Sequence, residues 1–268
     1  MVIGVGIIAL AGLIVFAVRT IWPRDSARAV GTDEAVERYR ASTEPLETTT
    51  TLPPAATTEP VDPTPTLPAE GVYLYVTSGS ESIDVLGGTT HPYPDETTLT
   101  VTEEGCGVLL RWDVLVERRE EWRLCIGDDG IEMLPMGAIY HEFFGTGRLE
   151  TQLCNGPLVV VPADGEPRPP VLWRCSLNDK EWLPVWEVLE PTELSVEGVP
   201  VRVTHVRMTV EDDDNYYEHT VVEWWLAESG LPVAMSANKV SNSDSGLIGD
   251  VVYREEYRAD LVSLTPLT

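Results

Sequence analysis

The chain has 268 residues, with 18 Lys and Arg against 44 Asp and Glu, which gives a net charge of −26 at pH 7. A surface this acidic repels nucleic acid and anionic lipid headgroups, so we expect neither as a partner. The length allows one sizeable folded domain, or two small ones, besides an anchor and a linker.

Residues 2–22, VIGVGIIALAGLIVFAVRTIW, predict a transmembrane helix that anchors the chain in the lipid bilayer. Residues 2–18 carry no charge, and a helix of this length rises roughly 31 Å, which matches the hydrocarbon core of a bilayer. Arg19 and Trp22 fall where basic and aromatic residues anchor such a helix at the interface. A cleaved signal peptide is the alternative, with Ala27-Arg28-Ala29 as its cleavage site, although its apolar core is normally shorter.

Two observations disagree on the orientation of this helix. Arg19, Arg24 and Arg28 follow it, and the positive-inside rule would place them in the cytoplasm. A linker rich in Thr and Pro, four regularly arranged cysteines and an acidic domain favour the opposite orientation. We therefore predict a single-pass protein of the cell membrane, a signal-anchor protein whose C-terminal domain is extracytoplasmic.

Two segments connect the helix to the rest of the chain. Residues 23–41 form a juxtamembrane segment in which TDEAVERYR predicts a short helix capped by Thr32. Only Val36 and Tyr39 form an apolar stripe, so we expect this helix to pack into no core. Residues 42–70 are rich in Thr and Pro, which predicts a disordered, extended tether of up to ~90 Å. That composition fits an O-glycosylated stalk and an undecorated spacer equally well.

The dominant hydrophobic period from residue 71 onward is two, which predicts a β-rich extracytoplasmic domain over residues 71–268. Alternating runs at 108–114 and 122–126 predict a hairpin that turns near residues 115–116. Four further runs predict an antiparallel meander: VPVRVTHVRMTV, YYEHTVVEWWL, LPVAMSAN and DVVYREEYRADLV. The apolar phase changes at residues 204–205, which predicts a β-bulge there. The expected fold class is all-β, with little helix after residue 40.

Four cysteines, Cys106, Cys125, Cys154 and Cys175, allow three disulfide pairings. Neither a CxxC pair nor a Cys/His set with zinc spacing occurs, so we expect no metal site and no cofactor. The local pairs Cys106–Cys125 and Cys154–Cys175 are favoured in an oxidising compartment, because each closes a loop beside alternating strands. Closing a loop of about 20 residues is worth roughly 3 kcal/mol in the chain-entropy model.

No catalytic motif stands in the chain: GxSxG, HExxH, a phosphate loop and a dinucleotide fingerprint are all absent. We therefore expect no catalytic residues and a protein that is not an enzyme. The pair His141-Glu142 is interpreted as an exposed polar pair on a strand. His205 and His219 fall in adjacent strands, where they could face each other on the surface. Residues 212–215 predict a hairpin turn with solvated charges rather than a calcium loop.

Seven tryptophans follow the tether, and two of them are adjacent. Alternation along a strand places Trp224 with Val222 and Leu226 on the apolar face. Trp225 then lies on the more polar face, where an exposed ring would suit a sugar or a lipid. Trp225 is therefore the candidate ligand-face residue, and packing in the core or at a sheet edge is the alternative interpretation of these rings.

Several stretches carry a resemblance to known proteins: DEAVERYR, GCGVLLRWDVL, EEWRLC, YHEFFG, WWLAESGLPV and VVYREEY. They resemble a group of uncharacterised actinobacterial membrane-anchored extracytoplasmic proteins. More distantly, the closing meander with its Trp-x-x-x-x-Gly-Leu-Pro turn is similar to half-barrel proteins related to lipoprotein-localisation factors. That resemblance implies a curved, half-barrel-like antiparallel sheet that wraps an apolar ligand.

These features together predict a membrane-tethered protein of the cell envelope whose β-rich domain binds a lipid or other apolar ligand without catalysis. A carbohydrate-binding module that uses exposed tryptophans is one alternative, and an unrecognised hydrolase is another. A concavity lined by Leu, Val and Trp would favour the lipid. A flat face with coplanar rings would favour the sugar, and a cleft with a carboxylate pair would favour the enzyme.

Overall fold

The computed structural model describes residues 25–43, 66–178, 180–212, 218–244 and 250–268. The membrane helix expected at residues 2–22 lies outside this part of the chain, as do most of the tether and most of the acidic turn at 212–215. Among the described residues, no helix is both long enough and apolar enough to cross a membrane.

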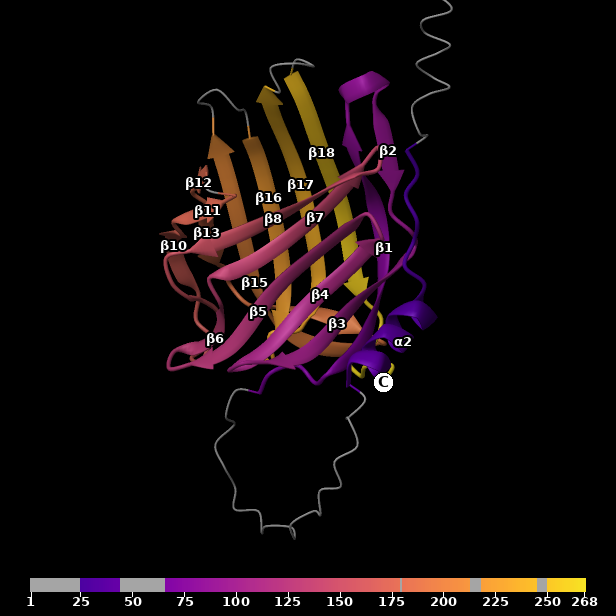
Figure 1. Cartoon of the computed structure of the whole chain (residues 1–268). Helices are drawn as coiled ribbons and strands as arrows, with labels where there is room; N and C mark the ends of the chain where they lie inside the picture. Colours follow the sequence, from indigo (N-terminus) through magenta and orange to yellow (C-terminus); the bar gives the residue numbers. More distant parts are fainter. Residues whose placement is uncertain (1–24, 44–65, 179, 213–217, 245–249) are drawn as a thin grey trace, which may run out of the picture.

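The domain is an all-β, antiparallel sheet that bends over on itself to form two crossing layers (Figure 1). The layers meet at β1 (Gly71–Ile83). Residues 75–83 of β1 pair with β18 (Asp250–Leu261), and residues 71–76 pair with β3 (Glu96–Glu104). One long strand therefore belongs to both layers.

The first layer is the antiparallel meander that the sequence predicts. It consists of β15 (Val199–Asp212), β16 (Glu218–Ala227), β17 (Pro232–Asp244) and β18, which pair in chain order. The β16–β17 turn packs against the opposite layer at Gly230, whose φ is +83°. A Cβ at this position would lie 2.8 Å from Cδ1 of Leu124, so both the conformation and the close approach require glycine.

The second layer crosses the first obliquely in Figure 1. It contains β3, β4 (Gly107–Leu115), β5 (Arg118–Gly127), β7 (Met136–Phe143) and β8 (Thr146–Cys154). The short β6 (Gly130–Met133) pairs with the end of β5 and with β9 (Leu158–Pro162). The β4–β5 hairpin turns between Leu115 and Arg118, as predicted. Disulfides join Cys106 to Cys125 and Cys154 to Cys175, which confirms the predicted pairing.

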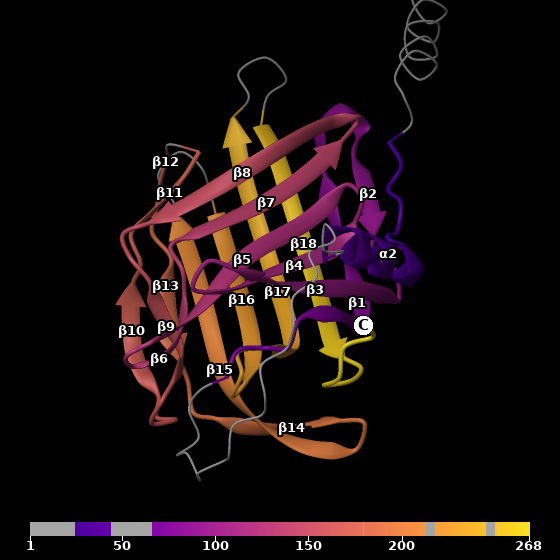
Figure 2. The ribbon, with the colours of Figure 1, turned by 60° about the horizontal axis from the view of Figure 1, so that its bottom comes forward.

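Residues 168–188, here called the seam, connect the far ends of the two layers. β10 (Arg168–Leu172) pairs with β13 (Val185–Val188), which in turn pairs with β15 of the first layer. β11 (Cys175–Leu177) pairs with β8 of the second layer and with β12 (Lys180–Trp182). The chain thus crosses between the layers twice, and the backbone N–H of Trp173 donates to the Pro184 carbonyl at 2.9 Å. Figure 2 shows these short strands together on the side away from β1.

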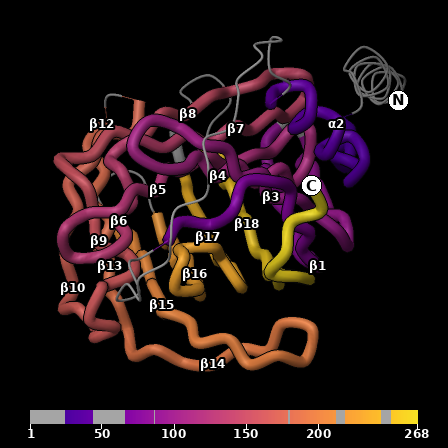
Figure 3. Tube along the Cα trace, turned by 90° about the horizontal axis from the view of Figure 1, so that it is seen from below, coloured from indigo at the N-terminus to yellow at the C-terminus, as the bar shows by residue number. Residues whose placement is uncertain are grey.

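Short elements lie at the rim of the sheet. β2 (Thr89–Pro92) pairs with the end of β1 after the 3-10 turn η1 (Val85–Gly87). β14 (Thr192–Val196) forms a hairpin with the start of β15. This hairpin extends beyond the layers at the lower edge of Figures 2 and 3.

The helix α2 (Thr32–Thr43) corrects the prediction that this segment packs into no core. Ala35 is 2 % exposed and packs with Val30 and with Val72 of β1. Val36 and Tyr39 flank this contact. The apolar stripe looked too narrow because the contact is completed by Val30, which precedes the helix, and by a strand 37 residues away. Residues 25–43 are therefore packed onto the β domain.

The predicted β-bulge at residues 204–205 is wrong. β15 pairs with β16 without a shift from Val203 to Asp212, and the register shift lies one strand on, after Trp225. The phase change in the apolar pattern has a different cause. β15 changes its other partner at this point, from β14 at residues 199–203 to β13 at residues 206–209.

Candidate ligand-binding cavity and buried ionic network

Strand alternation carries charged side chains into the interior of the sheet. On β5, Arg118 and Glu120 lie on the same side as the buried Trp122, because residues two apart share a face. Glu255 on β18 is also buried, and Lys239 on β17 is its partner in the ladder. Arg118 is 0 % exposed and Glu255 is 2 % exposed, so both charged side chains are shielded from solvent.

Four of these side chains, Arg118, Glu120, Lys239 and Glu255, form an ionic cluster that joins the two layers. Nη2 of Arg118 lies 3.0 Å from Oε1 of Glu255 and also contacts Glu120. Nζ of Lys239 lies 3.0 Å from Oε1 of Glu120 and 2.7 Å from Oε2 of Glu255. Each carboxylate therefore contacts both cations, and the formal charges of the cluster cancel. The Tyr93 hydroxyl donates a further hydrogen bond to Glu255.

A second set of groups, the carboxylate–histidine chain, leads from this cluster to the N-terminal segment. Glu81 of β1 lies 3.8 Å from Arg118, and its two oxygens lie 3.1 Å from Nδ1 of His91 and 3.2 Å from Nδ1 of His141. Nε2 of His91 lies 2.9 Å from Oδ2 of Asp25. The residues ahead of α2 are thereby tied to the interior of the sheet.

The cations of the ionic cluster control the protonation of its carboxylates. Burial raises the pKa of Glu255, but Arg118 and Lys239 outweigh burial and hold that pKa well below its usual range. Burial likewise raises the pKa of Glu120, and the same two cations reverse the effect, so its pKa is also lowered. Both carboxylates are therefore ionised at neutral pH.

In the carboxylate–histidine chain, too, burial and hydrogen bonding shift the pKa values in opposite directions. Burial raises the pKa of Glu81, while hydrogen bonds from His141 and His91 and the nearby charge of Arg118 lower it, and the net direction is down. Burial lowers the pKa of His91, but its hydrogen bonds to Glu81 and Asp25 raise it above the usual value for histidine. His91 thus gains affinity for a proton when the domain folds.

Beside the ionic cluster lies a cavity of about 70 Å³ between the layers, here called the tryptophan cavity. Trp186 and Trp224 stack with nearly parallel rings, 5.1 Å between centroids, and Trp173 meets Trp186 edge-on. A cavity of this size has room for about two water molecules or for the end of an apolar chain. Glu120 and Lys239 of the ionic cluster belong to the same lining, together with Trp122, Met133, Trp173, Trp182, Trp186, Met208, Val222 and Trp224.

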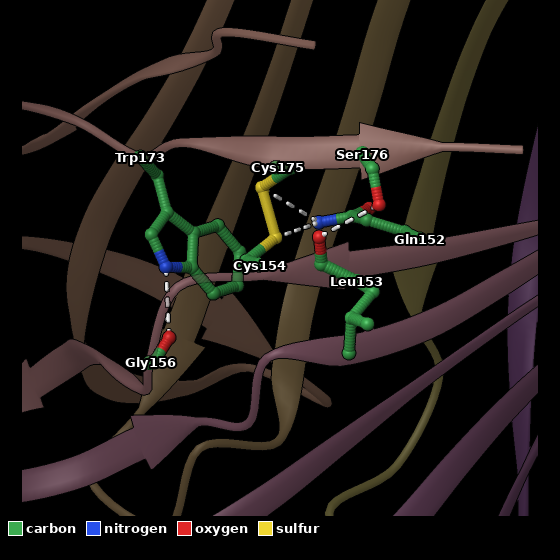
Figure 4. The surroundings of a disulfide bond; sticks show 7 residues. All are labelled: Gln152, Leu153, Cys154, Gly156, Trp173, Cys175 and Ser176. Carbon is green, nitrogen blue, oxygen red and sulfur yellow. Dashed lines mark hydrogen bonds between the residues drawn. A yellow bond between two sulfur atoms is a disulfide. The ribbon is translucent and has the colours of Figure 1, made fainter. Parts of the chain in front are cut away.

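The exposure of the lining residues shows where the cavity meets solvent. Val222 and Trp186 are 2 % and 4 % exposed, whereas Met136 at the start of β7 is 45 % exposed. Gln152 of β8 is a partly exposed lining residue beside the second disulfide, and its Nε2 lies 3.1 Å from Sγ of Cys154 (Figure 4). The opening therefore lies near the seam, where this disulfide fixes β8 to β11.

The interior thus combines an aromatic cavity with a neutralised ionic cluster. No protein-family model, curated protein or solved structure matches the chain. The walls of the tryptophan cavity are mainly aromatic and apolar, and their charged side chains are Glu120, Glu121 and Lys239.

Trp225, the predicted ligand-face residue, does not line this cavity. Trp224 is 8 % exposed and belongs to the core, while Trp225 lies on the opposite face of β16. The Trp225 ring stacks on His205 with centroids 4.7 Å apart, and the guanidinium of Arg258 lies 4.7 Å from the same ring. His205 comes from β15 and Arg258 from β18, on opposite sides of β16, so both flanks of the Trp225 ring are occupied.

The prediction that His205 and His219 face each other is wrong. In the β15–β16 ladder His205 is opposite Trp225, and His219 is opposite Glu211. The register therefore separates the two imidazoles by six positions along the strands. His205 instead lies 3.0 Å from Glu223, and His219 lies 3.3 Å from Glu211.

Sequence reasoning missed the buried charges, although a signal was present. Arg118 and Glu120 share the parity of Trp122, which belongs to the alternating run at residues 122–126. Charged residues at core positions seldom improve stability over apolar ones, so such positions point to a functional or specifying role. His141 was also misjudged, because its side chain turns inward to Glu81 rather than forming an exposed polar pair.

Proposed function

We propose that this chain is a membrane-tethered protein of the cell envelope whose β domain binds an apolar or amphipathic ligand without changing it chemically. The observation that carries the proposal is the tryptophan cavity, whose stacked rings provide a large apolar surface inside the sheet. Ligand sites in proteins are typically apolar and aromatic, with a few polar groups that fix orientation. Glu120 and Lys239 are the polar groups of this site.

The buried ionic cluster supports a binding role. Arg118 and Glu120 come from the second layer, and Lys239 and Glu255 come from the first, so the cluster spans the interior beside the cavity. Paired ions in a core contribute little net stability, but they restrict the ways in which two layers can pack. The cluster therefore keeps the layers in register where the ligand would lie.

The same contacts disfavour catalysis by the buried carboxylate pair Glu120 and Glu255. A carboxyl that donates a proton near neutral pH needs a raised pKa, as glycosidase acids have. Arg118 and Lys239 lower the pKa of both Glu120 and Glu255. Neither carboxyl is therefore suited to protonate a leaving group.

Native mass spectrometry of the full chain, purified in mild detergent, tests the binding proposal. We expect the wild-type protein to carry a bound small molecule that survives removal of the detergent. Val222→Phe fills the cavity and should abolish this adduct. The matched control is Val221→Phe on the opposite face of the same strand, which should retain it. Absence of an adduct from wild type, or its persistence in Val222→Phe, would overturn the proposal.

The envelope location is supported by the two disulfides, which form and persist in oxidising compartments. It is tested by Thr57→Cys, which places a thiol in the predicted tether. We expect a membrane-impermeant maleimide to label this thiol on intact cells. Labelling that appears only after lysis would place the domain in the cytoplasm.

A carbohydrate ligand is the second candidate, because the outer face of β1, β16, β17 and β18 carries a groove of about 380 Å³. Its walls include Ser78, Ser80, Ser236, Asn238, Glu223, Glu256 and Arg258, groups that can bind hydroxyls. The Trp225 ring, however, is already covered by His205 and Arg258. Titration with soluble cell-wall oligosaccharides decides this candidate: heat of binding that Ser236→Trp removes would support it, and no heat would exclude it.

A further inference from the structure

Residues 25–30, which come soon after the predicted membrane helix, are bound to the β domain by hydrogen bonds. One oxygen of the Asp25 carboxylate accepts from the backbone N–H of Phe144 at 2.8 Å, and the other joins the carboxylate–histidine chain. The Arg28 carbonyl accepts from the Val116 backbone N–H at 2.9 Å. The segment is therefore fixed to the domain at both the β7–β8 turn and the β4–β5 turn.

The chain stays on the domain through α2, which packs on β1 as described above. Figure 1 shows residues 25–43, in indigo, along the edge of the sheet from β2 to α2. The chain rejoins the same domain after residues 44–65. Leu67 packs against the main core, and the Ala69 carbonyl accepts a hydrogen bond from the Tyr73 hydroxyl at 2.8 Å. The two ends of the segment rich in Thr and Pro are thus held by one domain.

A segment whose two ends are held by one domain cannot determine the distance of that domain from a membrane. The sequence predicts residues 42–70 as such a spacer. The connection that remains is the stretch between Trp22, at the end of the predicted membrane helix, and Asp25. Three residue steps reach at most about 11 Å in a fully extended chain. If residues 2–22 span the bilayer, Asp25 therefore lies near its interface.

Strand pairing shows which end of the domain lies nearest Asp25. Its partner His91 belongs to β2, which pairs with residues 80–83 at the end of β1. The β14 hairpin lies at the opposite end of the domain in Figure 2. The end nearest Asp25, formed by η1, β2 and the β7–β8 turn, is here called the proximal rim. Its exposed residues include small ones that allow close approach to a flat surface, namely Gly88, Thr90, Gly145 and Thr146.

We propose that the β domain lies directly on the outer surface of the membrane, with the proximal rim toward the lipid headgroups. Residues 42–70 are then a loop of the domain rather than a spacer. This inference rests on the membrane anchor in the proposed function and adds an orientation and an interaction surface to it. The attachment of residues 25–43 to the sheet holds that orientation.

The test compares the distances of two labels from the headgroups. The four cysteines of the chain are all in disulfides, so Thr146→Cys in the proximal rim and Ser195→Cys in β14 each provide one free thiol. Each full-length variant carries bimane on this thiol and is reconstituted in phosphatidylcholine vesicles that contain a headgroup spin label, which quenches bimane only at short range. We expect the label at position 146 to lose most of its emission and the label at position 195 to keep most of it. Equal quenching at the two positions would overturn the inference.

The same ten-residue Gly/Ser insert at two sites distinguishes a loop from a spacer. Placed after Arg24, it adds roughly 17 Å between the membrane helix and the docked segment and should restore the emission of the label at position 146. Placed after Thr57, it is the matched control and should leave the quenching unchanged. Equal effects of the two inserts would overturn this inference alone. If the chain does not float with the vesicles, the membrane anchor of the proposed function fails, and this inference fails with it.

Discussion

Each member of the ionic cluster has partners on two strands, so removing one charge leaves others buried without a full counter-charge. Glu255→Gln leaves both Arg118 and Lys239 under-compensated. We expect it to lower the free energy of unfolding by about 3–5 kcal/mol. Glu256→Gln changes the exposed neighbour on the same strand and should cost within about 0.5 kcal/mol. Urea titrations of both variants measure the difference, and equal losses would contradict the role assigned to the cluster.

His91 predicts a pH dependence with a definite sign. Burial lowers the folded-state pKa of His91, but Glu81 and Asp25 raise it by more, to above the usual 6.5. The contribution of His91 to stability is therefore complete below pH 6.5. That contribution is lost as the pH rises through the folded pKa. We expect the free energy of unfolding to fall above pH 6.5 in wild type and to fall less in His91→Asn. The control His219→Asn should keep the wild-type profile.

The buried carboxylates affect the stability of the domain at acidic pH. Glu81, Glu120 and Glu255 have lowered folded pKa values, so the stability they contribute is present above about pH 4.5. It is lost as the pH falls through their folded values. Thermal denaturation between pH 5 and pH 2 should therefore show a steep loss of stability. A flat profile in that range would contradict the assigned directions.

At the scale of elements, strand patterns were predictable where both neighbours of a strand are regular. The meander at residues 199–261 and the hairpin around residues 116–117 follow from alternation alone. The β-bulge predicted at residues 204–205 is wrong because the neighbouring strand of β15 changes there from β14 to β13. Which strand lies next to β15 depends on the whole fold and not on the sequence of β15. The same limit applies to α2, whose buried face depends on Val72.

The packing of α2 is tested by placing a charge on its buried face. Ala35→Asp puts an unpaired carboxylate against Val30 and Val72, which should cost about 3 kcal/mol or more of unfolding free energy. Ala41→Asp, on the exposed last turn of the helix, should cost less than about 1 kcal/mol. Matching denaturation midpoints for the two variants would show that the helix does not pack on the sheet.

At the scale of the whole molecule, the class of fold was predictable and the interior was not. Alternation identifies which residues share a face, but only the closure of two layers decides that Arg118 of β5 meets Glu255 of β18. Those residues are 137 positions apart, and no local pattern links them. The cavity arises in the same way, from tryptophans that belong to the seam and to both layers.

The seam depends on one disulfide, so the two disulfides should differ in effect. Replacing Cys154 and Cys175 by Ser should cost roughly 3 kcal/mol and should also speed hydrogen exchange at residues 173–186, since this disulfide fixes β11 of the seam to β8. Replacing Cys106 and Cys125 should cost a similar amount without that local change. Equal hydrogen-exchange rates at residues 173–186 in the two double variants would contradict the prediction that only the Cys154–Cys175 disulfide stabilises the seam.

The position of β1 determines when the domain can fold during synthesis. β3 and β4 follow it within 45 residues, so the second layer can begin to pair early. Tyr75, in contrast, pairs with Leu261, which the ribosome adds 186 residues later. Pairings of such long sequence separation slow folding, because a large loop must close before they form. Until residues 250–261 reach β1, Arg118 lacks its contact with Glu255 and half of β1 lacks its strand partner, so a nascent chain lacking those residues is an expected substrate for chaperones and proteases.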